Sequence, residues 1–343
     1  MGRKTVYNSI TSPEKISAIN PNNIALMNDF LDYLKSVGRA SSTIKNYKAD
    51  LLVFFCWCED NLNNKYFVDL TKREISRFQN HALNVWQWSP NRLYTVKAAL
   101  SSLSNFIENI LDDEIRGYKP IIRKIENPPK QVVREKTVLS EEDVEKILNY
   151  LIEGKEYDKA CFFALAAFSG RRKSELCRFK VSDVSDDRLV CGGALYKTAP
   201  IKTKGRGVNG KQLCCYVLAR KFKPYLDLWM QYRAEHNIDS IWLFPKSGDD
   251  TQQISTSSVD SWSDTLSRVT GLEIYPHAFR HYFCTMLSRA GLPDSVITEI
   301  VGWESSDLCK VYIDIEADDQ IGLYFDEDGN IVSKNNSPGL SGL

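Results

Sequence analysis

Apolar residues recur every three or four positions in four stretches of the first third of the chain, which is the pattern of amphipathic helices. Gly38 is expected to end the first of them. Each stretch is preceded by a helix-start signal: Pro21-Asn22-Asn23, Ser41-Ser42-Thr43, the capping-box spacing Thr71-Lys72-Arg73-Glu74, and Ser89-Pro90. Four such helices in succession predict a compact helical domain.

The pattern changes in the second half of the chain. Leu139-Ser140-Glu141-Glu142-Asp143 predicts a new helix start, and another helix is expected from Asp158 to Phe168. Residues 188–219 contain short β-type runs separated by glycine-rich turns, which predict a small antiparallel sheet. Helical patterns return from Arg220 through Tyr312. The predicted fold class is therefore mainly α with a small antiparallel β-sheet.

A segment between these halves has a different composition. Residues 119–137 carry three prolines and six Lys or Arg residues with little apolar periodicity. This is typical of a linker, either following a DNA backbone or simply solvated. The predicted division is an irregular N-terminus (1–20), a helical domain (21–117), a linker (118–137), a mixed domain (138–318) and a C-terminal tail (319–343) that is disordered from Ser333 onward.

The distribution of charge changes this picture more than the net charge, which is zero. Residues 1–137 hold 20 Lys or Arg and 14 Asp or Glu, a difference of +6, whereas residues 314–343 hold 1 and 7, a difference of −6. From Arg188 to Lys223 there are nine basic residues and no acidic residue. Because binding follows the local field, the neutral average does not exclude a polyanionic partner.

Length and composition exclude several classes of protein. The chain has 343 residues, of which 43% are hydrophobic, without an apolar run long enough to span a membrane. Met1-Gly2-Arg3-Lys4 is not followed by the apolar run of a secretory signal. Nine cysteines without C-x-x-C spacing favour reduced thiols over disulfides or a zinc site. We therefore expect a cytoplasmic protein.

Candidate chemistry is concentrated towards the end of the chain. His277 and Arg280 share one face of a predicted helix start, where they could present a proton-transfer group and a fixed cation to one phosphate. Arg172, beginning a helical run with Glu175, adds a guanidinium, which suits a phosphate because it donates paired hydrogen bonds and keeps its charge. Taken singly, each has an ordinary structural interpretation, as a surface arginine or a helix-start histidine.

Three further side chains complete the candidate set. A lysine on the basic turn, Lys204 or Lys202, could give a proton to a leaving oxygen. Trp303 has an indole N–H that can donate to a phosphate oxygen but cannot shuttle a proton. Tyr312, nine residues later, is a candidate nucleophile, although a core tyrosine is the ordinary alternative. Tyr324 competes with it but lies in the acidic tail.

In this order and spacing the residues resemble the tyrosine recombinase (phage integrase) family. Trp303 stands where family members often have histidine. The resemblance rests on Arg172 with Glu175 three residues later, and on Pro276-His277-Ala278-Phe279-Arg280-His281 followed by Thr285, Gly291, Val301-Gly302-Trp303 and Tyr312. The family's arginine–glutamate spacing favours Arg172 over Arg171.

The resemblance implies a helical core-binding (SAM-like) domain over residues 21–117 and a mixed α/β tyrosine-recombinase catalytic domain over residues 138–318, which clamp duplex DNA. The first of these matches only at the level of pattern. The Thr-Lys-Gly context favours Lys204 over Lys202 as the hairpin lysine. Family members act as homotetramers on two specific sites and exchange C-terminal segments. No metal, ATP or other cofactor is implied, and the expected setting is a bacterial cytoplasm or nucleoid.

The implied reaction cuts and rejoins DNA through a 3′-phosphotyrosyl intermediate. Tyr312 would attack the scissile phosphate while Arg172 and Arg280 stabilise the charge of the transition state. Lys204 would protonate the leaving 5′-oxygen, and His277 would act as acid or base beside the tyrosine. Trp303 would support the phosphate.

Three other functions remain open at this point. A type IB topoisomerase shares the chemistry but acts as a monomer without strand exchange. A DNA-binding regulator could use the same fold, but it would not need Tyr312. A helical adaptor that binds protein fits poorly with the basic N-terminal half. Integration, excision and resolution are not distinguished, nor is the target sequence.

Overall fold

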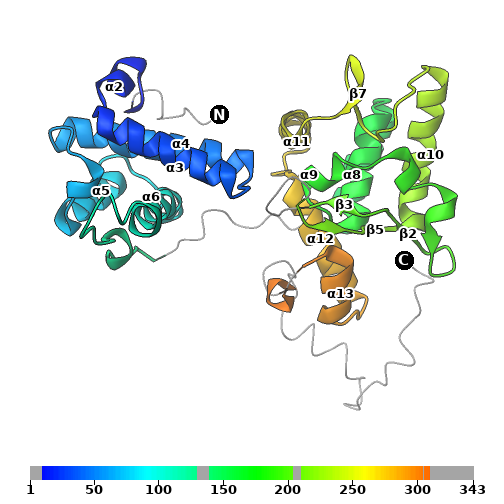
Figure 1. Cartoon of the computed structure of the whole chain (residues 1–343). Coiled ribbons are helices and arrows are strands. Elements are labelled where there is room, and N and C mark those ends of the chain that lie inside the picture. The colour runs from blue at the N-terminus through cyan, green and yellow to red at the C-terminus, as the bar shows by residue number, and fades with distance from the viewer. Residues whose placement is uncertain (1–9, 130–138, 204–209, 304, 310–343) are drawn as a thin grey trace, which may run out of the picture. The chain divides into compact units, whose positions relative to one another are not determined.

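The computed structural model describes residues 10–129, 139–203, 210–303 and 305–309. The chain divides into two compact units, with the boundary at residue 135. Each unit has a hydrophobic core of its own. Figure 1 shows the elements of both units, which are described separately here.

The first unit is entirely helical among its described residues. The four predicted helices are all present. Two of them start at the predicted caps, because Ser89 accepts from a backbone N–H of the helix that Pro90 begins and both halves of the capping box between Thr71 and Glu74 are formed. The predicted cap at Ser41-Ser42-Thr43 is wrong, because the N-cap of the second helix is Ala40, which makes no side-chain hydrogen bond there. Its elements are α2 (Pro13–Ala18), α3 (Pro21–Ser36), α4 (Ser41–Asn61), η1 (Phe67–Asp69), α5 (Lys72–Asn84), α6 (Pro90–Ile110) and η2 (Ile122–Lys124).

Two segments of this unit differ from the prediction. The N-terminus is not irregular throughout, because Ser12 caps the short helix α2 and Pro13 occupies its first turn. The predicted linker begins later than residue 118, because Ile122 is 1% exposed and packs into the helical core. Lys97 also holds this segment, donating to the Ile125 carbonyl at 3.0 Å. Apolar burial therefore outweighs the linker-like composition.

The second unit is built around helix α8. Residues 160–169 of this helix are all buried, because the helix carries Ala, Cys, Phe and Leu side chains on every face. Helices α7, α10 and α12 pack against it. The helical elements are α7 (Glu141–Glu153), α8 (Tyr157–Ser169), α9 (Lys173–Leu176), η3 (Val181–Asp183), η4 (Asp186–Arg188), α10 (Ala219–Glu235), α11 (Thr256–Thr270), α12 (Pro276–Arg289), α13 (Asp294–Val301) and η5 (Ser306–Leu308).

Short antiparallel strands make up the rest of the second unit. The order β1-β2-β5 forms one sheet, β3-β4 a second and β6-β7 a third. Their bounds are β1 (Leu189–Val190), β2 (Leu195–Lys197), β3 (Ile201–Lys202), β4 (Gln212–Leu213), β5 (Tyr216–Leu218), β6 (Pro245–Lys246) and β7 (Asp249–Gln253). The predicted fold class is confirmed, although β6 and β7 fall where the sequence pattern indicated helix.

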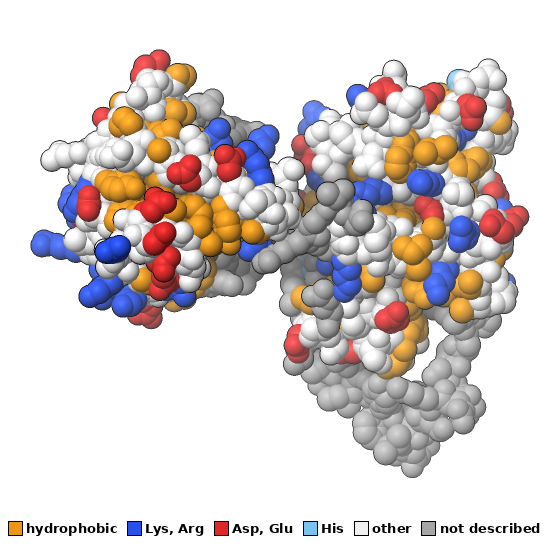
Figure 2. All heavy atoms as spheres, viewed as in Figure 1, with side chains coloured by type: hydrophobic (Ala, Val, Ile, Leu, Met, Phe, Trp, Pro, Cys, Tyr) orange, Lys and Arg blue, Asp and Glu red, His pale blue; other side chains and the backbone are white. Residues whose placement is uncertain are grey.

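The exposed surface of the helical unit carries both signs of charge. On the face drawn in Figure 2, acidic and basic side chains surround a band of hydrophobic side chains. Among the described residues, the longest helices are too polar to cross a lipid bilayer.

Candidate active site

The loop after α8 places Arg172 at the surface. Gly170 ends α8 with φ +58°, and a Cβ atom there would lie 2.3 Å from Cδ1 of Phe283, so this corner requires glycine. Arg172 then precedes α9, and its backbone N–H donates to Oε2 of Glu175 at 3.2 Å. The tight corner therefore fixes where the Arg172 side chain leaves the backbone.

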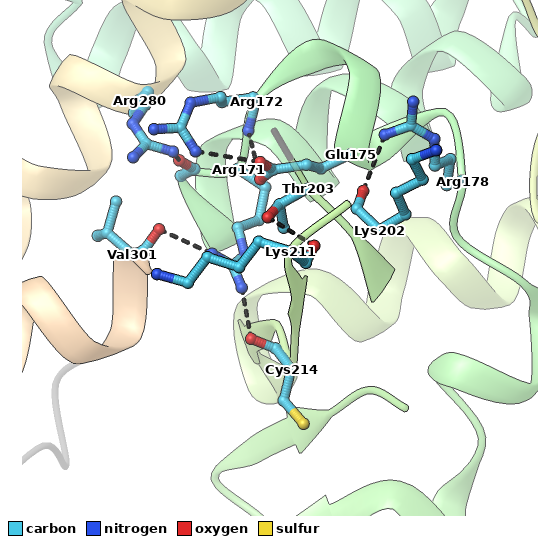
Figure 3. Close-up of polar contacts among 11 residues, drawn as sticks. Arg171, Arg172, Glu175, Arg178, Lys202, Thr203, Lys211, Cys214, Arg280 and Val301 are labelled. Atoms are coloured by element: carbon cyan, nitrogen blue, oxygen red, sulfur yellow. Dashed lines mark hydrogen bonds and ion pairs between the residues drawn. The ribbon is translucent and has the colours of Figure 1, made fainter. Parts of the chain in front are cut away.

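A buried carboxylate orients the Arg172 guanidinium. Nη1 of Arg172 donates to Oε1 of Glu175 at 3.1 Å, and the Glu175 side chain is 1% exposed whereas that of Arg172 is 30% exposed. Glu175 thus binds one edge of the Arg172 guanidinium while the Arg172 side chain stays accessible (Figure 3). Such a fixed cation is suited to an anion that arrives from solvent.

Helix α12 brings His277 and Arg280 to the same corner. Tyr275 precedes the helix, and Pro276 occupies its first position. Nη1 of Arg280 donates to the Gly170 carbonyl at 2.8 Å, which joins α12 to the loop that carries Arg172. Figure 3 shows the Arg172 and Arg280 side chains next to each other. The predicted His–Arg pair therefore lies on one helix and beside the second arginine.

The environment of His277 lowers its pKa from the ordinary value of 6.5. Desolvation of the imidazole is the largest cause, and the positive charges of Arg280 and Arg172 come next. The pKa of His277 falls because both effects disfavour the charged imidazolium. His277 is therefore neutral at pH 7 and can accept a proton.

Trp303 packs against Arg280. The centre of its ring is 5.3 Å from Cζ of Arg280, which is within range of a cation–π contact. Trp303 is 7% exposed and follows Gly302, which ends α13 with φ +73°. The structure thus gathers Arg172, His277, Arg280 and Trp303 at one place.

The basic hairpin is formed by β3 and β4. Nη1 of Arg178 donates to the Lys202 carbonyl at 2.8 Å, and Thr203 donates to the Lys211 carbonyl at 2.9 Å. Figure 3 shows the Lys202 side chain directed towards Arg178, whereas the Lys211 side chain points towards Val301. Lys204 lies outside the described residues, as do Tyr312, Tyr324 and the tail 319–343.

Sequence reasoning missed the structural role of Arg171. This side chain is 1% exposed, and its guanidinium bonds to backbone carbonyls of two distant segments. Sequence reasoning set Arg171 aside in favour of Arg172, whose accessible side chain the structure places beside Arg280. The spacing from Arg172 to Glu175 distinguishes the two arginines, but no local signal indicates the structural role of Arg171.

Comparisons with known proteins bear on the whole chain. The phage integrase family model matches residues 137–318, and the model of the phage integrase N-terminal SAM-like domain matches residues 26–116. The SPbeta prophage-derived recombinase-like protein YomM of Bacillus subtilis is 30% identical over 76% of this chain and 77% of its own. A tyrosine recombinase of Thermosipho africanus is 24% identical over 83% of this chain and 93% of its own.

Solved structures share the fold. XerH recombinase bound to a palindromic difH substrate has a TM-score of 0.61 at 17% identity, covering 87% of this chain and 88% of its own. The Tn1549 transposon integrase in complex with circular intermediate DNA has a TM-score of 0.60 at 16% identity, covering 88% and 99%. The chain belongs to the phage integrase family. The resemblance predicted from its motifs is confirmed, and so is its assignment as an enzyme of the tyrosine recombinase class.

Proposed function

We propose that this protein is a site-specific recombinase that cuts and rejoins duplex DNA through a 3′-phosphotyrosyl intermediate. The observation that carries the proposal is the convergence of Arg172, His277 and Arg280 at the corner formed by Gly170. The accessible guanidinium of Arg172, the buried guanidinium of Arg280, which is 0% exposed, and a neutral imidazole form a site for a phosphodiester. The family membership of the chain supports the same chemistry.

The proposed roles divide the reaction among six side chains. Tyr312 attacks the scissile phosphorus, and the 5′-oxygen leaves with a proton from Lys204. Arg172 and Arg280 stabilise the added negative charge, and His277 takes the proton from the tyrosine. Trp303 packs on Arg280 and supports the phosphate. The phosphotyrosyl bond keeps the energy of the broken bond, so a 5′-hydroxyl from a second strand can reverse the step.

Partner and assembly follow from the same proposal. The substrate is duplex DNA with specific recombination sites, and the active assembly is a homotetramer on two of them. A lambda integrase tetramer bound to a Holliday junction shares this fold, with a TM-score of 0.58. We place the protein in the cytoplasm or on the nucleoid of a bacterial cell. Integration or excision of a mobile element is the biological role that we favour.

A suicide substrate tests the proposal directly. A duplex nicked next to the cut site loses the released end by diffusion, so the covalent protein–DNA adduct accumulates and can be seen on a denaturing gel. Sequencing of junctions formed beside the protein's own flanking DNA then distinguishes recombination from simple nicking and closing. Binding without any adduct would instead indicate a DNA-binding regulator on this fold.

Loss of the hairpin lysine should be repaired by changing the leaving group. We expect Lys204→Ala to slow cleavage of ordinary DNA strongly, and to cleave a substrate with sulfur at the bridging 5′ position at nearly the wild-type rate. A thiolate leaves without needing a proton, so the general acid becomes dispensable. Lys202→Ala is the matched control. Rescue of Lys202→Ala alone would exchange the two roles.

DNA affinity should fall steeply with salt although the net charge is zero. Each neutralised phosphate contributes a slope of about −0.9 in log affinity against log salt concentration, and several phosphate contacts give a slope of several units. Fluorescence anisotropy with a labelled duplex between low and physiological salt measures it. A nearly flat dependence would contradict a clamp around the DNA backbone.

A further inference from the structure

Arg171 connects two segments that are far apart in the sequence. Its Nη1 donates to the Val301 carbonyl at 2.7 Å, and its Nη2 donates to the Cys214 carbonyl. Figure 3 shows the side chain extended between these two segments. Both of these hydrogen bonds end on backbone oxygens, and the Cys215 side chain lies within hydrogen-bonding reach of Arg171 as well. Arg171 therefore holds the backbone of these two segments in place.

Each acceptor belongs to an element that leads to a proposed catalytic group. Val301 is the last residue of α13, where the helix dipole is negative, and Trp303 follows two residues later. Along the chain this is also the approach to Tyr312. Cys214 follows β4, which pairs with β3, the strand that precedes Lys204. The Arg171 side chain thus binds the backbone of both segments that lead to proposed catalytic groups.

The packing around Arg171 is tight. A Cβ atom on Gly302 would lie 2.5 Å from Nη1 of Arg171 and 3.2 Å from Cδ1 of Leu213. The guanidinium therefore lies directly on the backbone corner that ends α13. A shorter side chain would not reach both carbonyls, and an apolar one would leave them without this donor.

We propose that Arg171 is a positioning residue for strand cleavage. By binding the Val301 and Cys214 carbonyls, it fixes two segments relative to its neighbour Arg172. One is the segment that leads to Trp303 and Tyr312, and the other is the lysine hairpin. It does this without contacting the DNA. This inference rests on the proposed recombinase function, in which those groups act on one phosphate.

Single-turnover cleavage of the suicide substrate tests the proposal with Arg171→Leu. We expect the rate constant to fall by about 100-fold, because small displacements of reacting groups have effects of that size. DNA affinity and the fraction of protein that reacts should stay within about twofold of wild type, since the residue does not touch DNA. A wild-type rate constant would overturn the proposal.

Arg233→Leu is the matched control. Arg233 is also a buried arginine of the second unit, 4% exposed, and it donates to the carbonyls of Ser240, Trp242 and Leu243. Its loss should lower the melting temperature while leaving the cleavage rate constant unchanged well below that temperature. An equal loss of rate in both variants would reduce Arg171 to a stabilising residue and overturn the proposal.

A substrate with a methylphosphonate at the scissile position separates positioning from charge stabilisation. Replacing a non-bridging oxygen by methyl removes the negative charge, so the defect of Arg172→Ala should be partly relieved. The defect of Arg171→Leu should persist, because the phosphate charge is not what Arg171 binds. Equal relief of both variants would place Arg171 on the phosphate and overturn the proposal.

Hydrogen exchange gives a readout that does not need activity. Arg171→Leu should speed amide exchange at residues 213–215 and 302–303, but not at residues 238–243, which Arg233 holds. If Arg171→Leu fails to fold, Arg171→Lys, which keeps the charge without the fork, is compared in the same way. Unchanged exchange would overturn the proposal. A wild-type protein that forms no adduct would instead overturn the recombinase function, and exchange would still test Arg171.

Discussion

Tyr312→Phe should abolish the covalent protein–DNA adduct and leave DNA binding unchanged. The substitution removes only the phenolic oxygen, which is the nucleophile in the proposed reaction, and keeps the ring. No other group in the proposed site can form the phosphotyrosyl bond, so the adduct should fall below detection. The measurement is the yield of adduct from a nicked suicide substrate on a denaturing gel, with affinity measured separately on intact duplex.

Tyr324→Phe is the control for this prediction. It removes the same atom from a tyrosine twelve positions further along the chain, among the acidic residues of the C-terminal tail. We expect this variant to form adduct at the wild-type rate, because a negatively charged neighbourhood suits a phosphate poorly. An adduct that survives in Tyr312→Phe and disappears in Tyr324→Phe would assign the nucleophile to the tail.

Arg172→Ala and Arg280→Ala should each slow cleavage by about 100- to 1,000-fold. Removal of one preorganised donor to the developing charge has an effect of this order, about 3–4 kcal/mol. Arg172→Lys should recover little of the loss, because a point charge cannot replace a guanidinium that Glu175 holds at 3.1 Å. Single-turnover rates on the suicide substrate at saturating protein measure the effect.

An exposed arginine elsewhere controls for the loss of positive charge. Arg268 lies on α11 and donates to the Asp264 carbonyl of its own helix. Arg268→Ala should change the cleavage rate at saturating protein by less than about threefold, a change of the size expected for a surface residue away from the site. A comparable loss from Arg268→Ala and Arg172→Ala would mean that general electrostatics, rather than contact with the phosphate, explains both.

Helix starts were predictable because they depend on neighbouring residues. The features that the sequence did not reveal depend on residues that are far apart along the chain. The capping box at Thr71 and the Ser89-Pro90 start need only neighbouring residues, and both formed as predicted. Strand β7 (Asp249–Gln253) is polar and mostly exposed, so it lacks the alternation that marks a strand. It is a strand because it pairs with β6, and the periodicity of the sequence does not reveal such a pairing.

Of the candidate site, the structure describes Arg172, His277, Arg280 and Trp303, and it adds a geometry that the sequence pattern does not contain. The spacing from His277 to Arg280 indicated one helix face, and the structure places both on α12. The approach of Arg280 to the Gly170 carbonyl joins residues 110 positions apart and has no local signature. The burial of Arg171 depends on acceptors at positions 214 and 301, so the spacing to Glu175 that favoured Arg172 gave no sign of the structural role of Arg171.

The lowered pKa of His277 makes protons and DNA coupled ligands of this protein. Desolvation causes the largest part of the lowering, but Arg280 and Arg172 cause part of it through their positive charge. In the proposed complex a phosphate offsets that charge, so the pKa of His277 rises when DNA binds. A higher pKa makes the neutral imidazole a stronger base in the complex, where His277 takes the proton from Tyr312 in the proposed reaction. Release of the DNA would lower the pKa again and favour loss of that proton to solvent, so that the imidazole is neutral for the next substrate.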